Sequence, residues 1–179
     1  MFHRSERLLL RPPWPEDWPL ILNGIADEAV VCNLASAPWP YRPDDARAFA
    51  ALPVAPAFPR FLITRADNAQ MLGCIGIDPA GTAGTAELGY WIARPHWGQG
   101  YATEAGRAVL DVARMLGHER IVASHFIDNP ASGKVLRKLG FVPTGDVRNR
   151  PSRGRGGEAP AAEYALDLVM DEPVRMRAA

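Results

Sequence analysis

The chain has 179 residues, 47% of them hydrophobic and 22% charged, which is typical of one soluble globular domain. Its 20 basic and 20 acidic residues cancel, which argues against a nucleic-acid-binding domain with its usual basic excess. Two isolated cysteines, four scattered histidines and no long apolar run argue against a disulfide framework, a metal site and a membrane span, so we expect a cytoplasmic protein.

The first sixty residues predict one strand and two helices. Glu6–Arg11 resembles a short strand that is stopped by a proline pair. A helix is expected from Pro15 to about Leu34, because apolar side chains recur there at helical spacing. A second helix is predicted from Pro43, where two acidic residues follow and suit the positive helix N-terminus, and it ends before Pro53.

The remainder predicts strands that alternate with two helices. The predicted strands are Arg60–Thr64, Met71–Ile77, Ala86–Ala93, Arg120–Ile127, Phe141–Arg148 and Glu163–Met170. The clearest helix is Tyr101–Leu116, which Gly117 ends, and the other runs from an N-cap at Asn129 to Leu139. A polar loop with four arginines joins the last two strands, and we expect it to be mobile.

This order of elements predicts an α/β (α+β) fold. The expected architecture is one domain over residues 1–179, with a mixed central sheet of six to seven strands flanked by about four helices. No internal repeat and no linker divides the chain. We expect a monomer or a homodimer.

The segment with the clearest chemistry is the glycine loop that opens the strongest helix. The first N–H groups of a helix have no partner within it, and the helix dipole adds partial positive charge there. Gly98 and Gly100 allow a polyanion to approach the backbone, as a pyrophosphate requires. A dinucleotide fingerprint fits poorly because Thr103 stands at its third glycine position, and no Gly-Lys-Ser/Thr tripeptide of a Walker loop occurs.

Two motifs carry a resemblance to a known family. The run ELGYWIARPHWGQGYATEAGRAVLDVA, with DNPASGKVLRKLGFVPTG some thirty residues later, resembles the GNAT superfamily of acyl-CoA-dependent N-acetyltransferases. More narrowly, the chain is similar to the RimJ/RimL type, which acetylates protein N-termini and begins like ERLLLRP here. The family's signature Gln/Arg-x-x-Gly-x-Gly/Ala falls on residues 97–102, with Trp97 in its first position. The similarity is strong over about residues 86–145, and the element order matches over nearly the whole chain.

The resemblance implies a GNAT-like acyl-CoA N-acyltransferase domain with acetyl-CoA as the donor. In the family, the strand before the loop splays from its neighbour and pairs with the pantetheine arm, a role that falls on Tyr90–Ala93. Backbone N–H groups around Gly98–Thr103 would hold the pyrophosphate, and Asn129 would bond the pantetheine arm. The implied cofactor-binding residues are Trp91, Ile92, Ala93, Trp97, Gly98, Gln99, Gly100, Tyr101, Ala102, Thr103, Asn129 and Ser132.

The sequence offers several candidates for the groups that transfer protons. Many family members place a tyrosine five residues before the phenylalanine of the Gly-Phe pair, to protonate the leaving thiolate. Here that position is Leu136, so a water or Ser132 takes this role, or no dedicated acid exists. The candidate bases are His125, which precedes Asn129 by four residues, then Glu87 and then Tyr90. The alternative is that the histidine is packed in the fold and the glutamate pairs with an arginine.

The leading prediction is an enzyme that moves acetyl from acetyl-CoA to a primary amine. A protein α-amine, with a pKa of about 7.7–8.0, loses its proton more readily than a lysine at about 10.4, and therefore suits a site without a strong base. A small amine acceptor is one alternative. A non-catalytic acyl-CoA-binding module is another, favoured by Leu136. Neither nucleic acid nor membrane is expected as a partner.

Overall fold

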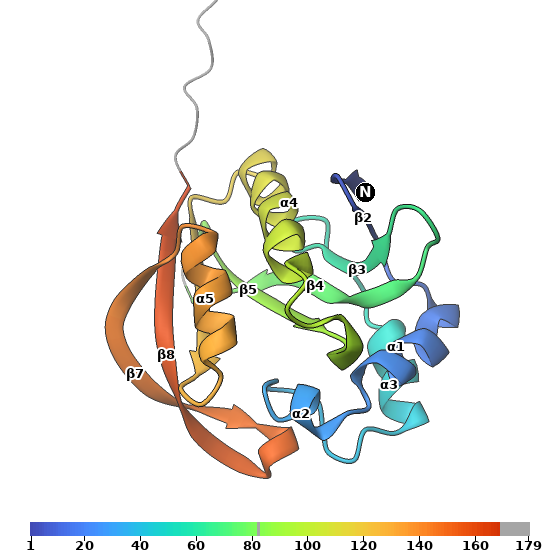
Figure 1. The fold of residues 1–179 in the computed structure, drawn as a ribbon. Helices are drawn as coiled ribbons and strands as arrows, with labels where there is room; N and C mark the ends of the chain where they lie inside the picture. Colours follow the sequence, from blue (N-terminus) through green and yellow to red (C-terminus); the bar gives the residue numbers. More distant parts are fainter. Residues whose placement is uncertain (82, 169–179) are drawn as a thin grey trace, which may run out of the picture.

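A mixed sheet runs through the middle of the molecule in the computed structural model, which describes residues 1–81 and 83–168 (Figure 1). In this part of the chain eight strands lie in the order β1-β2-β3-β4-β5-β6-β8-β7. Neighbouring strands are antiparallel except β5 and β6, which are parallel. The strands are β1 (His3–Arg4), β2 (Leu8–Arg11), β3 (Arg60–Arg65), β4 (Met71–Pro79), β5 (Thr85–Ile92), β6 (Arg120–Phe126), β7 (Val142–Ser152) and β8 (Gly157–Asp167).

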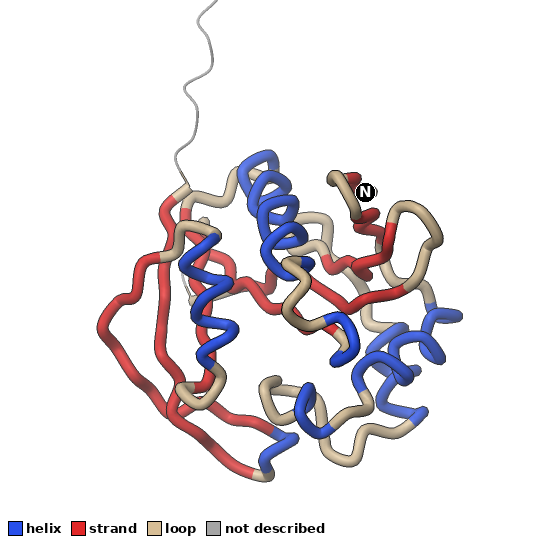
Figure 2. The backbone as a smooth tube through the Cα atoms, in the orientation of Figure 1, coloured by secondary structure: helices blue, strands red, loops and turns tan. Residues whose placement is uncertain are grey.

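Helices pack on both faces of this sheet (Figure 2). They are α1 (Trp18–Ile25), α2 (Glu28–Val31), α3 (Pro43–Ala50), α4 (Tyr101–Met115) and α5 (Pro130–Lys138), with 3-10 turns η1 (Pro15–Asp17), η2 (Arg94–His96) and η3 (Arg153–Arg155). The α/β class with a mixed sheet is confirmed. The described chain has one strand and one helix more than expected, because β1 and α2 are short elements that periodicity does not reveal.

Each face of the sheet has its own apolar core. Side chains of α4 and α5 pack with Leu88 and Ile92 of β5 in one cluster. Side chains of α1, α2 and α3 pack with Trp91 in the other. Since successive residues of a strand point to opposite faces, β5 contributes to both cores. Its alternation also decides that Tyr90 faces α4 and α5, whereas Glu87 faces the opposite side.

The predicted helix from Pro15 to Leu34 is wrong in its length, because the chain divides it into η1, α1 and α2. The break lies at Asp27, whose backbone is extended (φ −133°, ψ 126°). Its side chain accepts a hydrogen bond of 2.9 Å from the N–H of Ala29 and so caps α2. The apolar periodicity continues across this break, which is why the pattern alone predicted one helix.

The mobile loop expected between the last two strands is also wrong. Residues 148–160 form the far half of a hairpin, because β7 and β8 are each eleven residues long and pair as far as their connecting turn. Two arginines of this segment form ion pairs with the body of the protein, Arg150 with Glu87 and Arg155 with Asp128. The polar composition of this segment is typical of a loop. It does not reveal the hairpin, because the residues that pair with these arginines lie elsewhere in the sequence.

The boundary of the last strand also differs from the prediction. β8 begins at Gly157, well before the expected start at Glu163, since it pairs with β6 on one side and β7 on the other. The predicted end at Met170 lies outside the described residues. The short strand β1, which was not predicted, pairs with β2 at the outer edge of the sheet.

Two glycines in the central strands provide a matched test of this packing. A Cβ on Gly73 would overlap the carbonyl oxygen of Trp91 and lie 3.0 Å from the Cα of Ile92, whereas one on Gly89 would meet no described atom within 4 Å. We expect Gly73→Ala to lower the free energy of unfolding by at least about 2 kcal/mol, because a backbone neighbour cannot move aside. Gly89→Ala is expected to change it by less than about 0.5 kcal/mol. Urea denaturation measures both, and equal effects would contradict the register of β4 and β5.

Candidate functional site

The ladder between the parallel strands β5 and β6 stops early. Its residue pairs are Thr85 with Arg120, Ala86 with Ile121 and Glu87 with Val122. Beyond Glu87 and Val122 the described strands share no further pair, although β5 stays paired with β4 and β6 with β8. The facing edges therefore form a slot in the sheet. Their backbone N–H and C=O groups can pair with an extended ligand that carries amides.

The glycine loop lies at the end of β5 that forms this slot. Gly98 and Gly100 have φ angles of 74° and 81°, in the region that favours glycine. Gly100 is the N-cap of α4, and no side chain caps the first turn. Trp97 folds the loop back, since its indole N–H donates to the carbonyl oxygen of Ile92 at 2.6 Å. Backbone N–H groups that have no cap, next to glycines that have no side chain, are suited to binding an anion.

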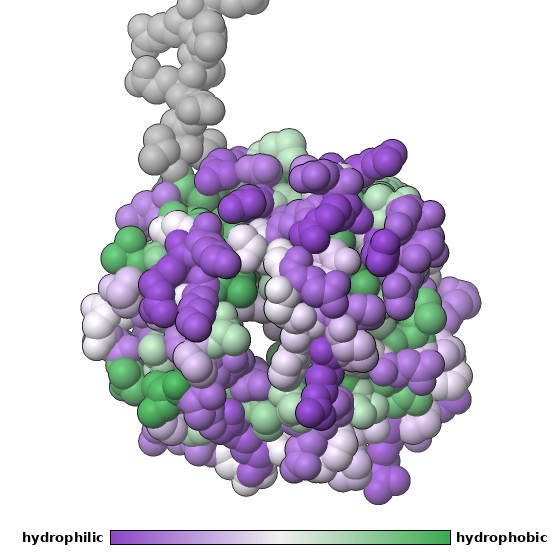
Figure 3. Space-filling model, viewed as in Figure 1, coloured by the Kyte–Doolittle hydropathy of each residue, from purple (hydrophilic) through white to green (hydrophobic). Residues whose placement is uncertain are grey.

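The start of α5 lies across the slot from β5. Asn129 is the N-cap of α5, as predicted, and its Oδ1 accepts from the N–H of Ser132 at 3.3 Å. The Ser132 Oγ and the Tyr90 hydroxyl are 2.8 Å apart, so a hydroxyl pair joins β5 to α5. Burial raises the pKa of Tyr90, and the hydrogen bond with Ser132 opposes this only in part. Tyr90 therefore keeps its proton in neutral solution. In Figure 3 the surface is hollowed between α5 and the loop before α4.

The position of the expected tyrosine on α5 holds no proton donor. Leu136 lies one helical turn beyond Ser132 and is 1% exposed within the core beneath α4 and α5. It packs as an ordinary apolar residue. One turn earlier on the same helix, Ser132 carries a hydroxyl group, which is in contact with that of Tyr90.

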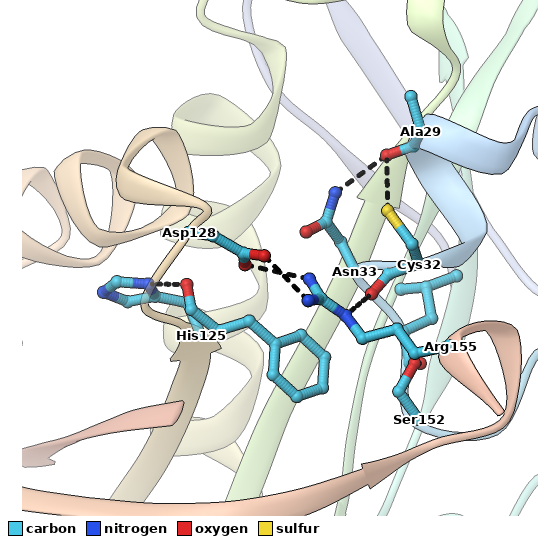
Figure 4. A network of polar contacts seen from close by, with 9 residues as sticks. Ala29, Cys32, Asn33, His125, Asp128, Ser152 and Arg155 are labelled. Atoms are coloured by element: carbon cyan, nitrogen blue, oxygen red, sulfur yellow. Dashed lines mark hydrogen bonds and ion pairs between the residues drawn. The ribbon is translucent and has the colours of Figure 1, made fainter. Parts of the chain in front are cut away.

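His125 lies on the α5 side of β6, apart from Glu87. Its Nδ1 lies 2.8 Å from the carbonyl oxygen of Phe126, which can only accept, so Nδ1 carries the proton in the neutral ring. Its Nε2 packs against the backbone of Gly133 and lies 3.4 Å from the Tyr164 hydroxyl. In Figure 4 the ring points away from the neighbouring network around Asp128. Both ring nitrogens thus have partners within the fold.

Glu87 faces the opposite side of the sheet, at the last pair before the strands separate. Its Oε1 accepts from Arg150 of β7 at 2.5 Å. Arg150 also lies 3.6 Å from a carboxylate oxygen of Glu163 on β8. The two carboxylates and the guanidinium form a partly buried charged cluster beside the slot. A pairing of Glu87 with an arginine was one of the predicted alternatives, and the partner is Arg150.

The tip of the β7–β8 hairpin binds two other segments of the chain beside the slot, and Figure 4 shows these contacts. Arg155 binds both carboxylate oxygens of Asp128, at 2.7 and 2.9 Å, and the carbonyl oxygen of Cys32 at 2.6 Å. Its guanidinium also lies over the ring of Phe126, 4.4 Å from the centroid. Ser152 donates to the carbonyl oxygen of Leu34 at 2.8 Å. The hairpin thereby joins the segment after α2 to the turn that precedes Asn129, a connection that no sequence spacing indicated.

Residues 1–81 and 83–168 contain neither a cluster of metal-ligating side chains nor a helix that could span a membrane. No group of three His, Cys, Asp or Glu side chains there could hold a metal ion. No helix in those residues has the length and apolar character to cross a membrane.

A match to a protein family shows which family the chain belongs to. Residues 7–142, more than half of the chain, match the family of the acetyltransferase (GNAT) domain. The chain belongs to the GNAT acetyltransferase family. The family predicted from the two sequence motifs is therefore confirmed.

Curated relatives match this GNAT chain over part of its length. It is 38% identical over 91 residues to the uncharacterized N-acetyltransferase YoaA of Bacillus subtilis, covering 50% of this chain and 51% of that protein. It is 34% identical over 92 residues to the ribosomal-protein-serine acetyltransferase of Escherichia coli, covering 49% of each. The match thus spans about half the length of these relatives.

Solved structures show that the fold extends over nearly the whole chain. A GNAT-family acetyltransferase from Bacillus anthracis has a TM-score of 0.82 at 24% identity, covering 93% of this chain and 98% of that one. The ribosomal L7/L12 alpha-N-protein acetyltransferase RimL, in complex with coenzyme A, has a TM-score of 0.78 at 20% identity, covering 96% and 100%. A structure of the predicted RimL type is thus among those that share the fold.

The two ends of α4 provide a matched pair for testing the glycine loop. Gly100 before α4 and Gly117 after it have φ angles of 81° and 82°. Alanine at either position is strained, so we expect each variant to lose about 1–2 kcal/mol of stability. Only Gly100→Ala is expected to weaken acetyl-CoA binding, by about tenfold, because the strained loop misdirects its N–H groups. Isothermal titration measures the affinity, and an equal loss in Gly117→Ala would argue against an anion site at the loop.

Proposed function

We propose that this protein transfers an acetyl group from acetyl-CoA to a primary amine, and that the acceptor is a protein N-terminal α-amine. The observation that carries the proposal is the uncapped N-terminus of α4 beside the open edge of β5. Acetyl-CoA has the complementary parts, a pyrophosphate and an amide-bearing arm that ends in a thioester. Support comes from RimL, which was solved in complex with coenzyme A, and from the similar ribosomal-protein-serine acetyltransferase.

The backbone supplies most of the binding groups in this proposal. The N–H groups of Gly98–Thr103 bind the pyrophosphate at the positive end of α4. The open edge of β5 at Trp91–Ala93 pairs with the amides of the arm. Asn129 and Ser132 line the other side of the slot. The side chain of Trp91 is buried in the core beneath α1, so its contribution is that of its backbone.

Tyr90 and Ser132 are the proposed proton donors to the leaving thiolate. They lie on the side of the sheet that also carries the glycine loop and the start of α5, and their hydroxyl groups are in contact. The raised pKa of Tyr90 suits a donor and disfavours the role of a base. The pair, from β5 and the first turn of α5, thereby supplies the proton donor that Leu136 cannot be.

Glu87 is the proposed acceptor of the amine's proton, directly or through one water. When bound, acetyl-CoA supplies an activated acyl carbon within the slot and occupies its α4–α5 side. The amine then approaches from the opposite side, where Glu87 lies at the point of separation. His125 is on the donor's side, and its two nitrogens face Phe126 and Tyr164. It is therefore proposed to orient the end of β6.

An α-amine suits this site better than a lysine side chain. Removing the proton from a lysine at neutral pH costs about 3–4 kcal/mol more than from an α-amine. The proposed proton acceptor, the carboxylate of Glu87, is already held in an ion pair with Arg150. The acceptor that is easiest to deprotonate therefore fits it best.

The function is tested with acetyl-CoA and two peptides that differ only at the amino terminus. One has a free N-terminus and an internal lysine, and the other is identical but N-terminally blocked. We expect thiol release and a single acetyl mass increment with the free peptide, and none with the blocked one. Acetylation of the blocked peptide would contradict the choice of an α-amine. Acetyl-CoA binding without turnover on any amine would support a binding module instead.

The two candidate bases are separated by a pair of substitutions. We expect Glu87→Gln to lower kcat/KM at least about 100-fold, because the proton acceptor is lost. His125→Gln is expected to keep activity within about threefold of the wild type. Acetyl-CoA affinity serves as the control and should not change in Glu87→Gln. The reverse ranking of the two variants would assign the base to His125.

A further inference from the structure

Arg7, one residue before β2, is fixed to the first turn of α4. Its Nε donates to one carboxylate oxygen of Glu104 at 2.7 Å, and its backbone N–H donates to the other at 2.8 Å. Ser5 adds a hydrogen bond of 2.7 Å to the same carboxylate. Burial tends to raise the pKa of Glu104, but these hydrogen bonds hold it below its usual value. The carboxylate is therefore ionised and anchors the guanidinium against α4.

The same guanidinium reaches the glycine loop. Its Nη1 donates to the carbonyl oxygen of Gln99 at 3.1 Å. Its Nη2 lies 3.5 Å from the position that a Cβ on Gly100 would take, and its Cζ lies 4.7 Å from the ring centroid of Tyr101. The Arg7 side chain thus contacts Gln99 and Tyr101, lies beside Gly100 and is held in place by Glu104.

The bond to Gln99 decides which way the next N–H points. The peptide between Gln99 and Gly100 is planar and trans, so its C=O and N–H groups point in opposite directions. Glycine takes positive or negative φ at little cost, so local sterics do not select the orientation of this plane. A donor on the carbonyl side does select it. Because Arg7 holds the carbonyl, the N–H of Gly100 points away from the guanidinium.

We propose that Arg7 is a positioning residue of the donor site, which holds the Gln99–Gly100 peptide in the orientation that binds the pyrophosphate. This inference rests on the proposed function, since the anion is taken to be the pyrophosphate of acetyl-CoA. Arg7 does not have to touch the anion, because its charge is balanced by Glu104. Its effect is transmitted through the backbone of the loop.

The test compares two acetyl donors with the same amine. S-acetylpantetheine carries the thioester and the amide arm of acetyl-CoA but has no pyrophosphate or adenosine. We expect Arg7→Gln to lower kcat/KM for acetyl-CoA about tenfold or more, through KM, while kcat stays within about twofold. For S-acetylpantetheine the variant is expected to match the wild type within about twofold. Arg7→Lys is expected to recover only part of the loss, because an ammonium group lacks the fork that spans Glu104 and Gln99.

Arg65 offers the matched control. It lines the same surface hollow as Arg7 and Tyr101, but its guanidinium binds Asp67, at 2.6 and 2.9 Å. Arg65→Gln is expected to leave kcat/KM unchanged for both donors. Thermal melting confirms that each variant is folded before it is assayed.

The outcomes separate this inference from the function on which it rests. An Arg7→Gln variant that loses activity equally with both donors, or with neither, overturns the positioning role. Full recovery by Arg7→Lys also overturns it, because charge alone would then suffice. A wild-type protein that shows no binding of acetyl-CoA by titration calorimetry overturns the proposed function itself, and the role of Arg7 with it.

Discussion

The early end of the β5–β6 ladder is the constraint on which the rest of the structure depends. A sheet normally satisfies its backbone groups through its neighbours, and here two central strands separate after three residue pairs. The separation leaves polar backbone groups facing a slot, which an amide-bearing ligand can satisfy. It also divides the sheet into two parts, β1–β5 and β6–β8, that other contacts must hold together.

Those contacts come from both faces of the sheet. On one face, side chains of α4 and α5 share a core with strands from both parts, and the Tyr90–Ser132 hydroxyl pair spans the gap. On the other, the β7–β8 hairpin crosses beneath the slot, with Arg150 bound to Glu87 and Arg155 bound to the segment after α2. Contacts on both sides of the slot thus hold the two parts of the sheet together. The groups proposed to move protons lie on two different sides of it, which separates the donor of a proton from its acceptor.

The elements that sequence patterns predicted well are those specified by local rules. Helix α4 has a continuous apolar face and glycines at both ends, and α5 has an asparagine cap followed by proline. Their positions were predicted to within a residue or two. The division of the first predicted helix at Asp27 was missed because a cap and an extended φ interrupted an apolar pattern that continued on both sides.

The sequence by itself determined the family, through two motifs that resemble it, and the glycine loop at the start of α4, because a helix N-terminus is a local feature that spacing reveals. The tertiary structure alone decided which side chains meet. It pairs Glu87 with Arg150, brings Tyr90 to Ser132 and places Arg7 on the glycine loop, across more than ninety residues of sequence. It also turns an arginine-rich segment that resembled a mobile loop into a bonded hairpin. The physical reason is that ion pairs and hydrogen bonds between distant segments depend on the register and twist of the whole sheet, which no local pattern contains.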